Sequence, residues 1–293
     1  MFCEAAAKPP PHKTLLFLPL CARDVERRWP PRLNVELPNT AICGVTGISS
    51  RGLEMATELL YQKDSYLREF EATVVAVEGA QVALDRTAFY PGGGGQPPDR
   101  GELFWDDGQA RVLKAKKQGG LVWHKLDADP PPVGTKVIGV LDWEHRYQLM
   151  RTHTALHILC GVIWRDYKAQ VTGGNMEPGR ARMDFEFETM RRELVEEIEK
   201  KINAEVAAAR PVRVNILPRE EAFQIPDLIR TKINLLPPEI TEVRTVEIVG
   251  LDLQADGGTH VANTSEVGPI RIVDYKSKGR INKRLVIELV ADG

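Results

Sequence analysis

Two histidines spaced four residues apart give the sequence its clearest chemical signal. His153 and His157 lie in RTHTALHIL, a segment with helical apolar spacing. Residues four apart share one face of a helix, so both imidazoles can reach a single cation. In LDLQADGGTHVANT, a Gly-Gly pair permits a tight turn that can present Asp256 and His260 together. Three of the six histidines thus fall into two compact motifs, which predicts a metal site.

The donor types in these two motifs predict zinc as the metal. Zinc accepts imidazole and carboxylate ligands in a tetrahedral arrangement, and a catalytic zinc keeps one position open for water or substrate. The zincin motif of metalloproteases is absent, because Thr154 stands where a glutamate would follow the first histidine. A peptidase is therefore disfavoured. The sequence is compatible with three protein ligands, His153, His157 and His260, or with four if Asp256 also binds the metal.

The elements that would position these residues change in type near Trp143. Before it, short runs of β-forming residues separated by Gly, Asp or Pro predict a small β-barrel. The predicted strands are 73–77, 81–84, 101–105, 111–115, 120–124 and 137–141. The glycine-rich segment 89–101 connects the predicted strand 81–84 to the predicted strand 101–105.

After Trp143, helical spacing predicts one helix over about 146–167 and a second over about 190–209, which Pro211 ends. Strands are predicted at 212–217, 243–249, 269–275 and 284–289. This order predicts an α+β domain with its helices on one face of a sheet. The predicted organisation is a segment outside the catalytic fold (1–54), a β-barrel-like domain (55–145) and a zinc-binding α+β domain (146–293).

Residues 1–54 differ from the rest in being rich in proline and arginine and in lacking sustained periodicity. They fit a targeting leader, a disordered extension or translated sequence upstream of the natural start. Met55 opens a regular globular pattern, so we expect a chain that begins there to fold and act like the full one.

Composition sets further bounds. The formal net charge is −2, so a polyanionic partner would have to be bound by a local basic patch. No apolar run is long enough to cross a bilayer, and the nearest, 15–20, is interrupted by Pro19. None of the four cysteines forms a CxxC pair, which indicates free thiols in a reducing cytoplasm.

Three separated motifs carry a resemblance to a known family. RTHTALHIL, followed about a hundred residues later by DGGTHVANTSEVGPIRI, resembles the editing domain of alanyl-tRNA synthetases and, more closely, the free-standing AlaX proteins. FYPGGGGQPPDRG at 89–101 resembles the glycine-rich motif of the β-domain in the longer AlaX forms. The family pattern is HxxxH…CxxxH, and Asp256 stands in the position of that cysteine. Asp256 is then either a direct zinc ligand or a group that orients a metal-bound water.

The resemblance implies a hydrolase that removes wrongly attached amino acids from tRNA(Ala), chiefly serine and also glycine, with the help of zinc. The chain carries no aminoacylation motif, so we expect it to hydrolyse rather than to charge tRNA. Two alternatives remain open. One is a deacylase for another mischarged tRNA, and the other is a non-catalytic tRNA-binding module with structural zinc.

Two further segments provide candidates at the reacting centre. Thr172, in AQVTGGN, resembles the family's hydroxyl-recognising threonine, or else it is a turn residue beside two glycines. Gln96 follows Gly93, Gly94 and Gly95 in a loop that is no P-loop, because no Lys-Ser/Thr follows. This loop either flanks the substrate pocket, with Gln96 near its mouth, or forms a simple turn.

Basic residues near the C-terminal end of the sequence could contact tRNA phosphates. The candidates are Arg182, Lys283 and Arg284, the last two within a group that includes Lys276, Lys278 and Arg280. A solvated basic face explains the same group equally well.

Overall fold

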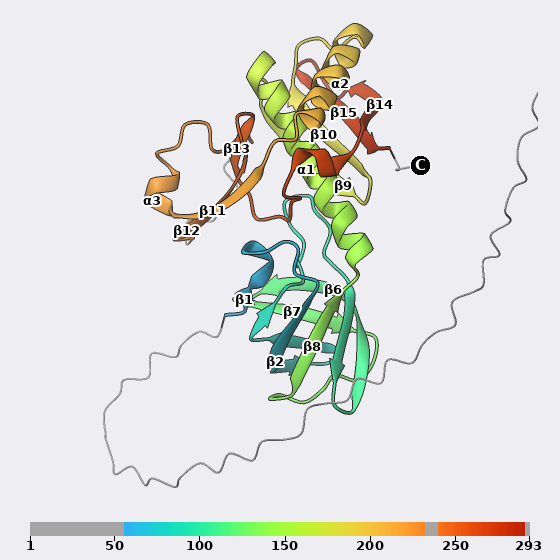
Figure 1. Ribbon diagram of the computed structural model, residues 1–293, viewed down its shortest axis with the longest axis vertical. Coiled ribbons are helices and arrows are strands. Elements are labelled where there is room, and N and C mark those ends of the chain that lie inside the picture. Colours follow the sequence, from blue (N-terminus) through green and yellow to red (C-terminus); the bar gives the residue numbers. More distant parts are fainter. Residues whose placement is uncertain (1–55, 232–239, 291–293) are drawn as a thin grey trace, which may run out of the picture. The chain divides into compact units, whose positions relative to one another are not determined.

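The computed structural model describes residues 56–231 and 240–290 (Figure 1). The first part of this chain is a closed barrel of six antiparallel strands in the order β2-β3-β7-β6-β5-β8. The strands are β2 (Glu69–Glu78), β3 (Gln81–Leu84), β5 (Gly101–Trp105), β6 (Gly108–Gln118), β7 (Leu121–Leu126) and β8 (Lys136–Leu141). All six sequence-predicted strands are present. The barrel-like part of the predicted fold class is confirmed.

Alternate side chains fill the barrel, as a closed sheet requires. Phe70, Leu103 and Val112 are among the buried residues of this core. Gly139 on β8 leaves room for the Phe70 ring, because a Cβ at that glycine would collide with the ring. A short parallel pair, β1 (Glu58–Leu59) and β4 (Arg86–Thr87), and the 3₁₀ turn η1 (Leu60–Gln62) precede or interrupt the barrel strands.

Helix α1 (Trp143–Tyr167) follows the last barrel strand directly. The Asp142 side chain accepts a hydrogen bond from the backbone N–H of His145 and so caps the helix start. The helix ends where Lys168 adopts the left-handed conformation. Every residue of 149–163 is buried, which is typical of a helix in the interior of a domain.

The α+β part contains a four-stranded antiparallel sheet in the order β14-β15-β10-β9. Its strands are β9 (Val171–Glu177), β10 (Arg180–Glu186), β14 (Ile270–Ser277) and β15 (Asn282–Leu289). One apolar core joins this sheet to α1 and to helix α2 (Arg192–Ala207). The predicted α+β class with helices packed on a sheet is confirmed (Figure 1).

A second sheet, of three strands, was not predicted as a separate unit. It has the order β11-β12-β13, formed by β11 (Val212–Pro218), β12 (Glu242–Ile248) and β13 (Asp252–Ala255). The short helix α3 (Arg219–Ala222) follows β11, and the 3₁₀ turn η2 (Thr264–Val267) precedes β14. Strands β9, β10 and β13 were absent from the sequence prediction, since glycines and charged residues weaken their β-pattern.

The predictions for residues 1–54 lie outside the described residues. No helix within the described ranges is long and apolar enough to cross a membrane.

Candidate metal centre

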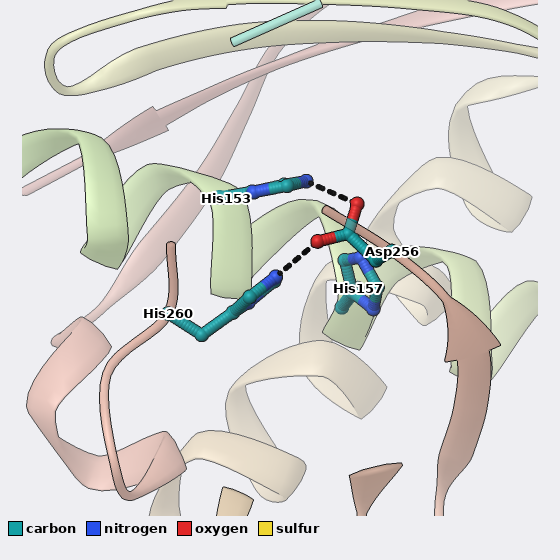
Figure 2. A group of neighbouring side chains, drawn as sticks. All are labelled: His153, His157, Asp256 and His260. Carbon is teal, nitrogen blue, oxygen red and sulfur yellow. Dashed lines mark hydrogen bonds and ion pairs between the residues drawn. The ribbon is translucent and has the colours of Figure 1, made fainter. Parts of the chain in front are cut away.

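The two histidine motifs meet in one cluster. His153 and His157 from α1 and Asp256 and His260 from the loop after β13 each offer a ligand atom, and these atoms lie within 4.8 Å of one another. Figure 2 shows the three imidazoles gathered around the Asp256 carboxylate. Side chains separated by about a hundred positions in the sequence therefore form a single group of metal-binding donors.

The helix supplies one half of this cluster through its own periodicity. His153 and His157 lie one turn apart on α1, and their ring centroids are 5.1 Å apart. Both side chains are almost completely buried, at 8% and 7% exposure. Their mutual placement needs nothing beyond a regular helix.

The loop supplies the other half through a tight turn. The backbone N–H of Gly258 donates to Asp256 Oδ2 at 2.7 Å, and His260 Nε2 lies 3.0 Å from the same oxygen. A side chain at position 258 would collide with the His153 ring, so the loop can approach the helix only with glycine there. As a result the His153 and His260 rings stack with centroids 4.3 Å apart.

Neighbouring side chains determine which ring nitrogen faces the cluster. His157 Nδ1 lies 3.3 Å from Asp252 Oδ2, a carboxylate at the start of β13 with no exposure. His260 Nδ1 lies 3.2 Å from the hydroxyl of Thr154. Asp252 and Thr154 thus lie at the Nδ1 side of the two rings. His157 Nε2 is left to face the cluster, and His260 Nε2 already meets the Asp256 carboxylate there; such contacts at the outer ring nitrogen are common around metal-binding histidines.

The electrostatics of three of the four side chains, His153, His260 and Asp256, favour the protonation states that metal ligands need, and His157 is the exception. Burial lowers the pKa of His153 to about 4, and burial with the nearby His153 ring holds the pKa of His260 well below its usual value. Burial alone would raise the pKa of Asp256, but His153 and the His260 hydrogen bond bring it well below its usual range. Burial likewise opposes a charge on His157, yet the Asp252 carboxylate raises the pKa of that ring.

The donor set fits a resident metal ion. Neutral imidazoles and an ionised carboxylate are ligand forms, and three imidazoles with one carboxylate suit zinc. The structure thus shows a group that could hold a metal ion, in agreement with the sequence prediction.

The glycine-rich loop of the barrel contacts the metal-binding loop. The Gln96 side chain is buried, donates through Nε2 to Thr259 Oγ1 at 2.8 Å and accepts from Thr259 N–H at 3.1 Å. Gly95 O accepts from the N–H of Met176 on β9 at 3.1 Å, and a Cβ at Gly95 would press on the Gly174 backbone. The loop therefore lies beside the metal cluster, and the amide of Gln96 is used to hold the neighbour of His260.

Arg244 on β12 is a charged neighbour of the cluster that the sequence analysis did not identify. Its Nη1 donates to the backbone oxygen of Asp256 at 2.9 Å and lies 3.7 Å from the Asp256 carboxylate. Its Nε donates to the backbone oxygen of Gln62 in η1. An arginine inside an ordinary strand pattern gave no signal of this role, and neither did Asp252 or Thr154.

The structure does not bring every predicted residue to the metal. Thr172 lies in strand β9, not in a turn, and its exposed hydroxyl donates to Asn282 Oδ1 at 2.9 Å. Gly93 pairs with Gln96 across the tip of the glycine-rich loop, and Gly94 is exposed there.

The predicted phosphate-binding cations are mostly occupied within the protein. Lys283 is buried and its Nζ donates to the backbone oxygens of Gly279 and Arg280. Arg284 forms two hydrogen bonds with Asp184. Arg182 lies 3.6 Å from the same carboxylate and keeps 38% of its side chain exposed, which leaves it the best placed of the three.

The chain is similar in sequence to known alanyl-tRNA editing proteins. Over 234 residues the chain is 43% identical to the alanyl-tRNA editing protein AlaX-M of Saccharolobus solfataricus, a match that covers 78% of this chain and 97% of that protein. The chain belongs to the AlaX-M family. The AlaX-M protein of Methanosarcina mazei is 41% identical over 80% of this chain and 97% of its own length.

Synthetases share the same region. The alanine–tRNA ligase of Pyrobaculum neutrophilum is 37% identical over 86% of this chain, which corresponds to 28% of the ligase. Two family models also match: class II (A) tRNA synthetases at residues 53–145, and the second additional domain of threonyl- and alanyl-tRNA synthetases at 243–286. The second match contains the Asp256–His260 loop, and the first contains the glycine-rich loop. The resemblance seen in the sequence motifs is therefore confirmed.

Proposed function

We propose that this AlaX-M protein is a zinc-dependent deacylase that removes serine, and secondarily glycine, from mischarged tRNA(Ala). The observation that carries the proposal is the convergence of His153, His157, His260 and Asp256 on one point, in a chain that belongs to a family of alanyl-tRNA editing proteins. We further propose that it acts in the cytoplasm, where its tRNA substrate would be charged.

The donor set supports zinc with Asp256 as the fourth ligand. All four ligand atoms lie within 4.8 Å of one another, and the carboxylate already faces two of the three Nε2 atoms. A bound zinc would supply a Lewis acid that positions the aminoacyl ester or polarises the attacking water. Asp256 is the most exposed of the four side chains, at 18%, so substrate would approach from its side of the cluster.

The chain's own residues hold this centre closed and preorganised. Asp252 and Thr154 fix the orientation of two imidazoles, and Gln96 ties the barrel loop to Thr259. An activated ester needs less chemical help than an amide, so positioning in a site with little water can contribute much of the rate enhancement. Among the described residues, the carboxylates in contact with the cluster are Asp256 and Asp252, and Asp252 lies against the Nδ1 side of His157, so neither is an evident general base.

Selectivity against alanine requires a polar partner, because a pocket that admits serine cannot reject alanine by size. We propose Thr172 for this role. Its hydroxyl already donates to Asn282, and a hydroxyl oxygen retains lone pairs that can accept from the serine side chain. Thr172 lies on β9, the same strand as Gly174 and Met176, whose backbones are next to Gly95 of the glycine-rich loop.

Hydrolysis assays with seryl-, glycyl-, threonyl- and alanyl-tRNA, each on its matched tRNA, test the proposal. Rapid release of serine from tRNA(Ala), with zinc near one per chain and loss of activity on chelation, is the expected result. Preferred hydrolysis of another aminoacyl-tRNA would show a different deacylase. Tight tRNA binding with a full zinc complement and no hydrolysis would show a binding module.

A further inference from the structure

The hairpin of β6 and β7 concentrates positive charge in a protein that is nearly neutral. Residues 111–125, RVLKAKKQGGLVWHK, contain five lysines and arginines and no carboxylate. Arg111 is paired with Asp127 at 2.6 Å. The other four, Lys114, Lys116, Lys117 and Lys125, are all exposed, and we call them the hairpin patch.

The pairing of the two strands puts most of this patch on one surface. Ala115 and His124 are opposite each other and buried in the barrel, so their neighbours along each strand face outward. Lys114 lies directly opposite Lys125, and Lys116 lies directly opposite Trp123. Trp123 is partly exposed. The outer surface of the hairpin therefore presents lysines around an aromatic side chain.

These lysines differ from the cations on the four-stranded sheet. There, Arg180 pairs with Glu288, Arg284 with Asp184, and Lys276 with Asp274. No ion pair with a carboxylate occurs for the hairpin patch within the described ranges 56–231 and 240–290. Like charges directly opposite in a sheet are destabilising, and the Lys114–Lys125 pair has no carboxylate partner among the described residues.

The tip of the hairpin lies on the side of the barrel that meets the metal-binding loop. The N–H of Thr57 donates to Gly120 O at the hairpin turn. The chain then passes into η1, where Gln62 O accepts from Arg244, the neighbour of Asp256. Thr57 and Gln62 are five positions apart, a span of at most about 18 Å in extended chain. A macromolecule whose end enters the metal site can thus reach the hairpin.

We infer that the hairpin patch binds the sugar-phosphate backbone of the tRNA whose 3′ end occupies the metal centre; this rests on the proposed function. Unpaired lysines attract phosphates and release their counterions, and such contacts position a nucleic acid without reading its sequence. The exposed face of Trp123 can stack on an unpaired base. The closely spaced phosphates of a tRNA backbone complement the charge of several lysines that no protein carboxylate neutralises.

The test measures binding of uncharged tRNA(Ala) as a function of salt. A triple variant, Lys114→Ala with Lys116→Ala and Lys125→Ala, removes three charges from exposed strand positions. The control variant, Lys63→Ala with Lys136→Ala and Lys200→Ala, removes the same number from exposed positions elsewhere. We expect the dissociation constant to rise about tenfold or more in the patch variant, and the slope of log K against log salt to fall by about 2, at roughly 0.7–0.9 per lost phosphate contact. The control should stay within about twofold of the parent.

Several results would overturn the inference. The first is an unchanged salt slope in the patch variant, and the second is an equal loss of tRNA affinity in the control variant. The third is a patch variant that loses binding to anionic lipid vesicles or to an acidic peptide but still binds tRNA like the parent. Uncharged tRNA needs no hydrolysis, so binding is scored separately from the proposed activity. Hydrolysis of a seryl ester of adenosine, which lacks the stem, should be equal in both variants and the parent. Absence of that hydrolysis in all three proteins would contradict the proposed function alone.

Discussion

The two halves of the metal cluster are built in different ways. His153 and His157 take their places from the repeat of α1, whose middle is buried on all sides. Asp256 and His260 lie on a loop whose shape depends on contacts from distant segments, with Gln96 from the barrel holding Thr259 and Arg244 holding the Asp256 backbone. The helix half is a local structure, whereas the loop half makes part of its supporting contacts with the barrel and with β12.

This difference suggests a role for the barrel beyond carrying the chain to α1. Gln96 and Thr259 are separated by 163 residues, yet both polar atoms of the amide are used on one partner. Asp99, just beyond that loop, pairs with the buried Arg146 at the start of α1. The barrel thus anchors to both halves, and variants of each half should separate local from long-range support.

Loss of a ligand from either half should have the largest effect. His157→Ala in the helix half and His260→Ala in the loop half each leave three donors. We expect metal content to fall from about one per chain to near zero, and ester hydrolysis to fall by more than about 100-fold, which exceeds the usual cost of changing a supporting residue. Elemental analysis and single-turnover hydrolysis measure both. His145→Ala, a half-buried histidine at the start of α1 outside the cluster, is the control, and equal metal in all variants would contradict the site.

Much of the helix half was accessible from the sequence, because a four-residue histidine spacing becomes geometry as soon as a helix forms. The loop half was accessible only as a motif: Gly-Gly next to His260 predicts a tight turn but not what closes it. The partner of Gln96 was beyond prediction, since no local pattern links residues 163 positions apart.

The secondary structure likewise was predictable where local residue preferences decide it and not where long-range pairing does. Strand 101–105 was predicted with the bounds that β5 has in the structure, because it contains Phe104 and Trp105, which favour strands, and turn residues flank it. The sequence predicts no strand at β9, and a turn beside Gly173-Gly174 is one of its two readings of Thr172, whereas pairing with β10 makes this segment an edge strand. Tertiary pairing overrides weak local preference there, as it does for the charged β10.

Removal of the Asp252 carboxylate should weaken the helix half without removing a ligand. Asp252→Ala leaves His157 Nδ1 without its acceptor, so the ring can turn or change tautomer. We expect metal affinity to fall by about 10–100-fold, measured by competition with a chelator. Asp252→Asn keeps an oxygen acceptor and should recover part of the loss. Equal affinities of the alanine variant and the parent would mean that the helix alone orients His157.

Removal of the Gln96 amide should weaken the loop half. Gln96→Leu keeps the bulk but leaves the buried N–H and hydroxyl of Thr259 unpaired, at about 1–3 kcal/mol per unsatisfied group. We expect a lower melting temperature, and a smaller loss of metal affinity than Asp252→Ala causes. Gln118→Leu, at the exposed end of β6, is the control. A Gln96→Leu protein that matches the parent in both measurements would show that the loop half forms without the barrel.

The smallest effect is expected at Thr172, which touches neither half. Thr172→Val removes the hydroxyl and its bond to Asn282, and Thr172→Ser keeps both. Since the site is exposed, the valine variant should fold normally, with unchanged zinc content and tRNA affinity. A lost neutral hydrogen bond costs about 0.5–1.5 kcal/mol, so hydrolysis of the serine ester should slow by several-fold, while hydrolysis of the glycine ester should stay the same.

The glycine ester distinguishes recognition of the serine hydroxyl from a change in the shape of the site, because glycine has no hydroxyl to bind. If Thr172→Val slowed both esters equally, β9 would act by shaping the site through its contacts with the glycine-rich loop, and Thr172 would not recognise serine. If neither ester were affected, selectivity would lie nearer the metal cluster. The Gly93–Gln96 segment would then be the next to vary, because it links the barrel to both β9 and the His260 loop.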